Sequence, residues 1–300
     1  MMNKRITFIL LSVLFLGTVS VFAGNIFVNE DGIQADNYYS GEGNEGISFN
    51  MTLEELVDND YRMIVENGLI VNITNATSQG NETSDFPSEG LIAYYKLDET
   101  SGTTASDELG SYDGTNNGAD VGVTGKINTA YDFEKSEDDY ISLPSSIGTA
   151  LSNTELTINL WIKPEQEFNS AIGITTLFDS QGTNRILIDY DSYANGGIRA
   201  YYGVNTPYTT TFSADTWYMI TFVVTDGTNY LYINGSEVAT ISNSGLVSIG
   251  TATTIIGENY AISSGRGMDG LIDEVYIASR ALNSTEVSEL YNSGSGLSYS

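Results

Sequence analysis

The segment from Trp217 to Ile241 reads WYMITFVVTDGTNYLYINGSEVATI and contains three runs of β-branched and aromatic residues. The pairs Asp226-Gly227 and Asn234-Gly235 separate these runs. An Asx-Gly pair between two such runs is a strong hairpin signal, because Asn, Asp and Gly tolerate the positive φ angles of a tight turn. Two consecutive hairpins make a β-meander, so this segment predicts an antiparallel sheet.

The same alternation of short strand and turn extends to both sides of the meander. In residues 157–163, Ile158, Leu160 and Ile162 share one face of a predicted strand, which Pro164 ends. Further strands are predicted at residues 91–97, 130–133, 140–143, 172–178, 185–190, 197–202, 253–256 and 270–277. Residues 283–291 have a helical pattern. Many short strands joined by Gly, Asn and Asp turns predict an all-β fold, a two-sheet antiparallel sandwich.

The N-terminus has the pattern of a secretory signal peptide over residues 1–23. Lys4 and Arg5 precede an apolar run from Ile6 to Phe22, and Ala23 occupies the last position of a cleavage site. A retained membrane anchor is the alternative, because the run is close to the length of the shortest membrane spans. We therefore expect a secreted or cell-surface protein with no membrane insertion after signal cleavage.

Composition divides the remaining chain into four parts. Residues 24–73 predict a small β-rich module, with a hairpin at 61–73 that turns at Asn67-Gly68. Residues 74–90, TNATSQGNETSDFPSEG, are small and polar and predict a linker. Residues 91–293 are assigned to the sandwich, and residues 294–300 to a C-terminal tail.

The chain is strongly acidic, with 11 Lys and Arg against 39 Asp and Glu and a formal net charge of −28. Such a surface repels nucleic acid and anionic lipid, whose binding proteins need clustered basic residues. There is no His and no Cys. This excludes imidazole- and thiolate-based nucleophiles, zinc sites of those ligands and disulfides. Any catalytic or metal-binding chemistry must therefore come from carboxylates, hydroxyls, amides and backbone oxygens.

Five blocks, in order and spacing, carry a family resemblance. They are GLIAYYKLDETSGTTASDELGSYDGT from Gly90, GKINTAYDFEKSEDDYISLP from Gly125, LTINLWIKP from Leu156, TWYMITFVVTDGTNYLYINGSEVA from Thr216 and GLIDEVYIASRALNSTEVSELY from Gly270. Together they resemble the laminin G-like jelly-roll domain of the concanavalin A-like lectin/glucanase superfamily. The resemblance implies a jelly-roll sandwich and a protein that binds or cleaves glycans.

The catalytic members of that superfamily carry Glu-x-Asp-x-Glu on one strand, which places three carboxylates on one face. This chain has no such run. Its nearest strand-borne acids are Asp189 and Asp191, which lack the Glu acid. We therefore expect no enzymatic activity.

The resemblance also implies one structural calcium ion, which some relatives hold near the beginning and end of the domain. It assigns Asp273 as a ligand, with oxygens around Asp98 and in the Asp138-Asp139 loop nearby. Hard cations prefer such oxygens, but the sequence has no EF-hand loop. The alternative is that these carboxylates are simply solvated.

Tyr and amide residues in Gly- and Asn-rich segments are the candidate ligand-binding residues. A Tyr ring there can stack on a sugar, while Asn or Arg binds its hydroxyls. The alternative for each Tyr is packing against a cross-strand neighbour. The predicted ligand-binding set is Tyr193, Arg199, Tyr202, Asn205, Tyr208 and Tyr260.

Together these observations predict a non-catalytic, secreted or cell-surface binding protein. Its expected partner is an extracellular glycan or a surface protein. The alternative is a structural fibre or surface-layer component, in which the sandwich is a spacer and residues 24–73 form a homo-oligomer. A glycoside hydrolase is the third hypothesis and the least supported by the residues.

Overall fold

The computed structural model describes residues 86–193, 196–262 and 265–299, and the backbone of three strands nearer the N-terminus. Those strands are β1 (Arg5–Thr7), β2 (Asn25–Asn29) and β3 (Gly32–Ala35), which form an antiparallel sheet in the order β1-β2-β3. They belong to a unit of residues 1–83, and residues 84–300 form a second unit. The hairpin predicted at 61–73 lies outside the described residues.

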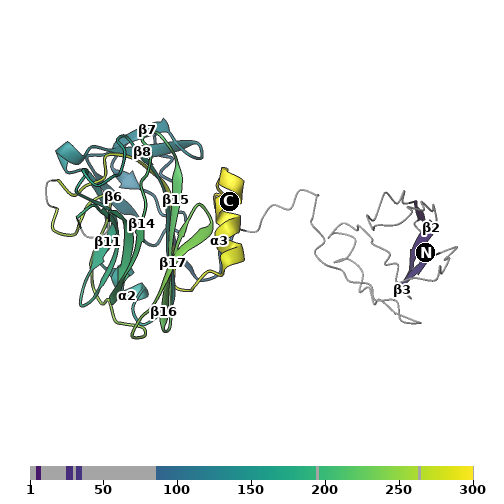
Figure 1. Cartoon of the computed structure of the whole chain (residues 1–300). Helices are drawn as coiled ribbons and strands as arrows, with labels where there is room; N and C mark the ends of the chain where they lie inside the picture. The colour runs from purple at the N-terminus through teal and green to yellow at the C-terminus, as the bar shows by residue number, and fades with distance from the viewer. Residues whose placement is uncertain are drawn as a thin grey trace. The chain divides into compact units, whose positions relative to one another are not determined.

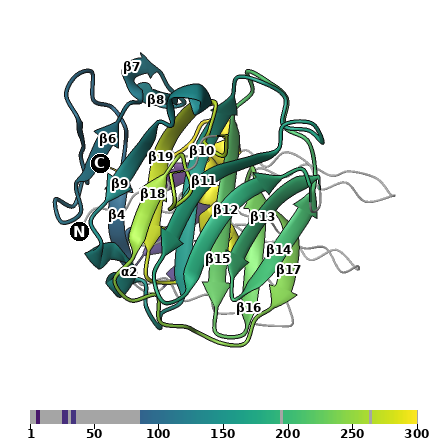
Figure 2. The same ribbon diagram turned by 90° about the vertical axis from the view of Figure 1, so that its left-hand side faces the viewer.

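The second unit contains two eight-stranded antiparallel sheets (Figures 1 and 2). The first, the β10 sheet, has the order β17-β16-β15-β10-β19-β8-β7, with β4 also paired to β19. Its strands are β4 (Leu91–Tyr95), β7 (Asp120–Thr124), β8 (Thr129–Phe133), β10 (Leu156–Pro164), β15 (Tyr218–Thr225), β16 (Thr228–Ile233), β17 (Ser236–Ser242) and β19 (Gly270–Ala278).

The second sheet, the β11 sheet, has the order β14-β13-β12-β11-β18-β9-β6-β5. Its strands are β5 (Thr104–Ala105), β6 (Gly114–Asn117), β9 (Tyr140–Leu143), β11 (Ile174–Gln181), β12 (Arg185–Asp191), β13 (Gly197–Tyr202), β14 (Val204–Thr209) and β18 (Thr253–Ile256). The remaining elements are η1 (Lys135–Glu137), α2 (Ser146–Ala150), α3 (Ser284–Tyr291) and η2 (Asn292–Gly294). The predicted two-sheet antiparallel jelly roll is confirmed.

The quoted meander folds as the sequence predicts. Strands β15, β16 and β17 are joined by the two Asx-Gly turns. Asn234 and Gly235 both have positive φ, 50° and 75°, as a type I′ turn requires. At the other turn Gly227 has a φ of 109°. Glycine is the residue that tolerates this conformation without strain.

The core lies between the two sheets and follows the period of two along each strand. Ile158, Leu160 and Ile162 of β10 are fully buried and face the interior, as do Ile186 and Ile188 of β12. Full burial of each such side chain contributes about 1.5–3 kcal/mol relative to exposure. Trp161 points from β10 to the opposite side, so it is buried outside the sandwich interior.

Helix α3 covers that outer side of the β10 sheet (Figure 1). Asn283 caps it through a capping box with Glu286. Val287 and Leu290 are buried, and the Tyr291 ring stacks on Trp161 with ring centroids 5.7 Å apart. Among the described residues, no helix is long and apolar enough to cross a membrane.

The two ends of the described unit meet in an aromatic cluster, the end clasp, formed by Phe86, Tyr94, Tyr276 and Tyr299. The Phe86 ring lies 4.9 Å from Tyr94, 5.8 Å from Tyr276 and 5.4 Å from Tyr299. The Tyr276 hydroxyl donates to the Pro87 carbonyl at 2.8 Å. Residues 86–90 of the predicted linker and residue 299 of the predicted tail therefore pack on the sandwich, because their rings cover apolar surface that would otherwise be wet.

Candidate functional site

A polar face forms on the outer side of the β11 sheet. Along β12, Ile186, Ile188 and Tyr190 face the core, so Leu187 and Asp189 face outward. Strand register then sets the neighbours. Asp189 pairs with Arg199 and Leu187 with Tyr201 on β13, while Gln181 of β11 pairs with Arg185.

These side chains surround a groove of about 400 Å³. Arginine, tyrosine, amide and hydroxyl groups share its lining with one apolar side chain. The lining residues are Gln181, Thr183, Asn184, Arg185, Leu187, Arg199, Tyr201 and Asn205. Figure 2 shows strands β11 to β14, which carry them, side by side.

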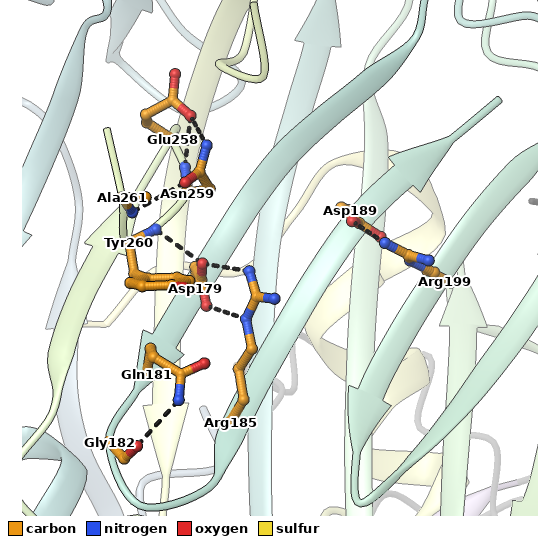
Figure 3. Close-up of polar contacts among 10 residues, drawn as sticks. All are labelled: Asp179, Gln181, Gly182, Arg185, Asp189, Arg199, Glu258, Asn259, Tyr260 and Ala261. Carbon is orange, nitrogen blue, oxygen red and sulfur yellow. Dashed lines mark hydrogen bonds and ion pairs between the residues drawn. The ribbon is translucent and has the colours of Figure 1, made fainter. Parts of the chain in front are cut away.

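Arg185 is held against the groove by a buried carboxylate (Figure 3). Its Nε donates to Asp179 Oδ1 at 2.8 Å and its Nη2 to Asp179 Oδ2 at 2.6 Å. Asp179 is fully buried and also accepts from the Tyr260 backbone N–H at 2.8 Å. The guanidinium lies 5.2 Å from the centre of the Tyr260 ring. Among the described residues Arg185 Nη1 has no hydrogen-bond partner, so it is available to a ligand.

Arg199 is bound by two acids of β12. Its Nε and Nη2 donate to Asp189 at 2.6 and 2.8 Å, and its Nη1 lies 2.6 Å from Asp191 Oδ2. Burial raises the pKa of Asp189, and the two hydrogen bonds from Arg199 oppose that rise. These bidentate pairs fix the arginine planes and neutralise the acids of the groove.

The structure brings three of the predicted ligand-binding residues to this face. Arg199 and Asn205 line the groove. Tyr260 is 44% exposed, and its ring lies against the guanidinium of Arg185, which lines the groove.

The other three predicted residues lie elsewhere. Tyr202 is a correction: it is fully buried in the core, where its hydroxyl accepts from the Val247 N–H, because it lies on the opposite face of β13 from Arg199. Tyr208 pairs with the inward-facing Ile198, so it points away from the groove face at the sheet edge. Tyr193 is 82% exposed in the β12–β13 loop and is not among the groove-lining residues.

The predicted set left out Tyr201, although this tyrosine adjoins the same Gly- and Asn-rich segments, and sequence analysis missed the β11–β12 turn. Tyr201, rather than Tyr202, points outward from β13, on the same face as Arg199. Thr183, Asn184 and Arg185 come from the turn and the start of β12. The period of two, counted from the alternating Ile186 and Ile188, was the signal that could have found Arg185 and Leu187.

The residues predicted to bind calcium each accept backbone N–H groups, and Asp98 lies near enough to Asp273 for its charge to help raise the Asp273 pKa. Among the described residues, Asp98, Asp139 and Asp273 form no group of carboxylate oxygens close enough to share an ion. Asp273 Oδ2 accepts from the N–H groups of Lys126 and Ile127 at 2.7 and 3.1 Å, and burial raises its pKa to about 8.

Asp98 accepts from the Thr129 N–H at 2.9 Å, and Asp139 from the Glu134 N–H at 2.9 Å. These carboxylates anchor backbone turns through N–H donors, which compete with any cation for the same lone pairs.

A different acidic group does converge in the described part of the chain. Carboxylate oxygens of Asp132, Glu134 and Glu165 lie within 4.8 Å of one another. Burial, followed by the repulsion of neighbouring carboxylates, raises the pKa of each. Sequence analysis did not single these residues out, because Glu165 follows β10 and is far in sequence from Asp132 and Glu134 at the end of β8.

Comparison with solved structures supports the fold. Domain 4 of AbnA, an extracellular arabinanase of Geobacillus stearothermophilus solved with arabinotriose, matches with a TM-score of 0.52 and 23% identity, over 66% of this chain and 97% of that one. The Trypanosoma rangeli sialidase with sialic acid matches with a TM-score of 0.54 and 16% identity, over 72% of this chain and 35% of that one. This chain therefore spans about a third of the sialidase.

The binding domain of Paraclostridial Mosquitocidal Protein 1 matches with a TM-score of 0.53 and 19% identity, over 69% of this chain and 52% of that one. No curated protein matches the chain in sequence. The family model of the concanavalin A-like lectin/glucanases superfamily matches residues 135–288, more than half of the chain. Residues 135–288 include the strands on both sides of the groove. The chain belongs to the concanavalin A-like lectin/glucanases superfamily.

Proposed function

We propose that this chain is a non-catalytic glycan-binding protein that acts outside the cell and holds its ligand in the groove of the β11 sheet. The observation that carries the proposal is the pair of arginines fixed by buried aspartates beside Tyr201 and Tyr260. Sugar recognition needs aromatic faces for the ring carbons and rigid donors for the hydroxyls.

The amide groups of the groove suit the hydroxyls of an oligosaccharide. Gln181, Asn184 and Asn205 offer amide donors and acceptors on both sides of Leu187. The domain of the arabinanase that shares this fold was solved with arabinotriose. A short oligosaccharide of that kind is therefore the first ligand to test.

The absence of turnover is part of the proposal. Most glycosidases need two carboxyl groups, one of them free to donate a proton. Here both oxygens of Asp179 and both oxygens of Asp189 accept hydrogen bonds from arginines, so neither carboxyl group is free to serve in such a pair. Export is proposed from the signal-peptide pattern of residues 1–23.

A tyrosine pair tests the proposal. Tyr201→Ala should weaken binding to arabino-oligosaccharides by about tenfold, since loss of a stacking ring costs about 0.5–1.5 kcal/mol beyond the area that it buries and about 1.4 kcal/mol corresponds to a factor of ten. Tyr208→Ala is the matched control, because Tyr208 lies on the neighbouring strand but points away from the groove. Titration calorimetry measures both, after a screen of neutral and acidic polysaccharides.

Equal losses in the two variants would place the ligand elsewhere. Release of reducing ends from a bound glycan would contradict the non-catalytic part. Retention of no glycan at all would favour the structural hypothesis.

A further inference from the structure

The groove of the β11 sheet brings together more acids than bases. Its eight lining residues include two cations, Arg185 and Arg199, and no lysine. Both oxygens of Asp179 bind Arg185, and both oxygens of Asp189 bind Arg199 (Figure 3). Asp191 binds Arg199 as well, at 2.6 Å. Three carboxyl groups therefore stand against two guanidinium groups.

These three acids are part of the groove wall. Asp179 is fully buried, and Asp189 and Asp191 are 2% and 4% exposed. Strand register places Asp179 directly opposite Leu187, which lines the groove, and Asp189 directly opposite Arg199. Charges interact more strongly near protein than in bulk water. A ligand in the groove is therefore exposed to the field of the acids as well as to that of the arginines.

Arg199 has no positive charge to spare for an anionic ligand. Its Nε and Nη2 donate to Asp189, and its Nη1 lies against Asp191. Asp191 is itself fixed, because its Oδ1 accepts from the backbone N–H of Tyr193 at 2.9 Å. The count gives no positive excess in either protonation state of Asp189, since a protonated Asp189 still leaves Asp191 opposite Arg199.

Arg185 is the one group that supports the opposite reading. Two of its five N–H donors go to Asp179, and the donors that remain suit either a pair of sugar hydroxyls or a carboxylate. Its charge is already balanced by Asp179, and Asp189 follows on the same face of β12, two positions beyond Leu187. Hydroxyls bring no further negative charge to this face, whereas a carboxylate does.

We propose that the groove selects neutral glycans and rejects glycans that carry carboxylate or sulfate groups, with Asp191 as the acid that removes the positive excess. The inference rests on the proposed glycan function and names its substrate class. Specificity of this kind comes from groups that repel the wrong ligand as well as from groups that bind the right one. Recognition of acidic ligands relies instead on clusters of arginine whose charge is not opposed.

Matched neutral and acidic forms of the same glycan test the selection. Arabinan, galactan, glucan and mannan are each compared with the product of oxidising their primary hydroxyls to carboxylates, and with the methyl ester of that product. We expect the full chain at pH 7.5 to bind the oxidised form about tenfold more weakly than the neutral form, on the order of the effect of one like charge. The ester should restore most of the affinity, and added salt should narrow the difference, because it screens the repulsion.

Asp191→Asn tests the residue assignment. The amide removes one negative charge and keeps an oxygen for the Tyr193 N–H, so the ratio of neutral to oxidised affinity should fall by about threefold or more, as an order of magnitude for one removed charge. Asp120→Asn is the matched control, because it changes the net charge equally at an exposed position of β7, in the other sheet. Its ratio should equal that of the wild type.

Tighter binding of an oxidised glycan, lost in Arg185→Met, would overturn the neutral selection while glycan binding itself stands. A difference that neither salt nor the methyl ester reduces would also overturn it, since the cause would then be the lost hydroxyl rather than charge. Retention of no glycan at all would overturn both the selection and the proposed function. If Asp191→Asn fails to fold, the salt and ester series on the wild type decide the question.

Discussion

At the scale of single residues, the most unusual group is Glu274 on β19. It is 1% exposed, has a left-handed φ of 51° and lies at an irregularity in the pairing with β10. Burial raises its pKa to about 8, and the Ser298 hydroxyl opposes this rise only in part. Glu274 is therefore neutral in the folded protein up to weakly alkaline pH.

This predicts a pH dependence of stability with a definite sign. The folded state keeps the Glu274 proton up to about pH 8, whereas the unfolded chain releases it near its ordinary value of 4.5. The folded state binds the extra proton between these values, so the free energy of unfolding falls as pH rises through the window. The slope is at most about 1.4 kcal/mol per pH unit.

Glu274→Gln should remove this component, because the amide keeps the shape and does not titrate. Urea unfolding of both proteins between pH 4.5 and 8.5 measures it. Repulsion among the other acids changes with pH in both proteins and cancels in the difference. Parallel curves for wild type and variant would contradict the assignment.

The residue scale also shows where sequence analysis reaches its limit. The strand pattern predicted β13, and Arg199 was among the predicted ligand-binding residues. The pattern could not distinguish Tyr201 from Tyr202, because adjacent tyrosines give no alternation and one position reverses the face. Ion pairs such as that of Arg185 with Asp179 leave no trace in the sequence, since they depend on which strands become neighbours.

At the scale of elements, α3 is a helix whose start is set by residues close together in the sequence. Asn283 Oδ1 accepts from the N–H groups of Thr285 and Glu286, and Glu286 returns a bond to the Asn283 N–H. Glu286 is also held by Arg280, through two contacts of 2.9 and 2.7 Å. The helix therefore has a fixed start and one buried face over Trp161.

Removal of the cap should lower stability by a predictable amount. Asn283→Ala costs about 1 kcal/mol, because two backbone donors lose their acceptor. For a domain of this size that is a fall of roughly 2–4 °C in melting temperature. Ser284→Ala is the matched control in the same exposed turn. Equal melting temperatures for the two variants, by calorimetry, would mean that the cap contributes nothing.

At the scale of the whole molecule, the sequence predicted the two sheets but not which flanking residues pack on them. Strand pattern and turn residues indicated two antiparallel sheets, because each strand carries its own signal. The first sandwich strand starts at Leu91, where composition placed it, but residues 86–90 already pack on the sandwich. A lone aromatic in a polar segment looks like linker until its partners, Tyr94, Tyr276 and Tyr299, are known.

Limited proteolysis should therefore cut N-terminal to Phe86, within the polar residues 74–85, and leave a fragment that retains Phe86 and Pro87. Mass spectrometry of the resistant fragment identifies the cut. Phe86→Ala should move the cut toward Leu91 and lower the melting temperature, since three ring contacts are lost. Leu109→Ala, which truncates a 37%-exposed side chain, is the control. A wild-type fragment that starts at Leu91 would contradict the packing of residues 86–90.

The end clasp has a mechanical consequence. Phe86 and Tyr299 are in ring contact, so the chain enters and leaves the sandwich at one spot on the outer side of the β10 sheet. A tensile load pulled through these two ends meets the clasp and β4 first. The β11 sheet, with its groove, lies outside that load path. Traction on both ends therefore opens the clasp before it disturbs the groove of the β11 sheet.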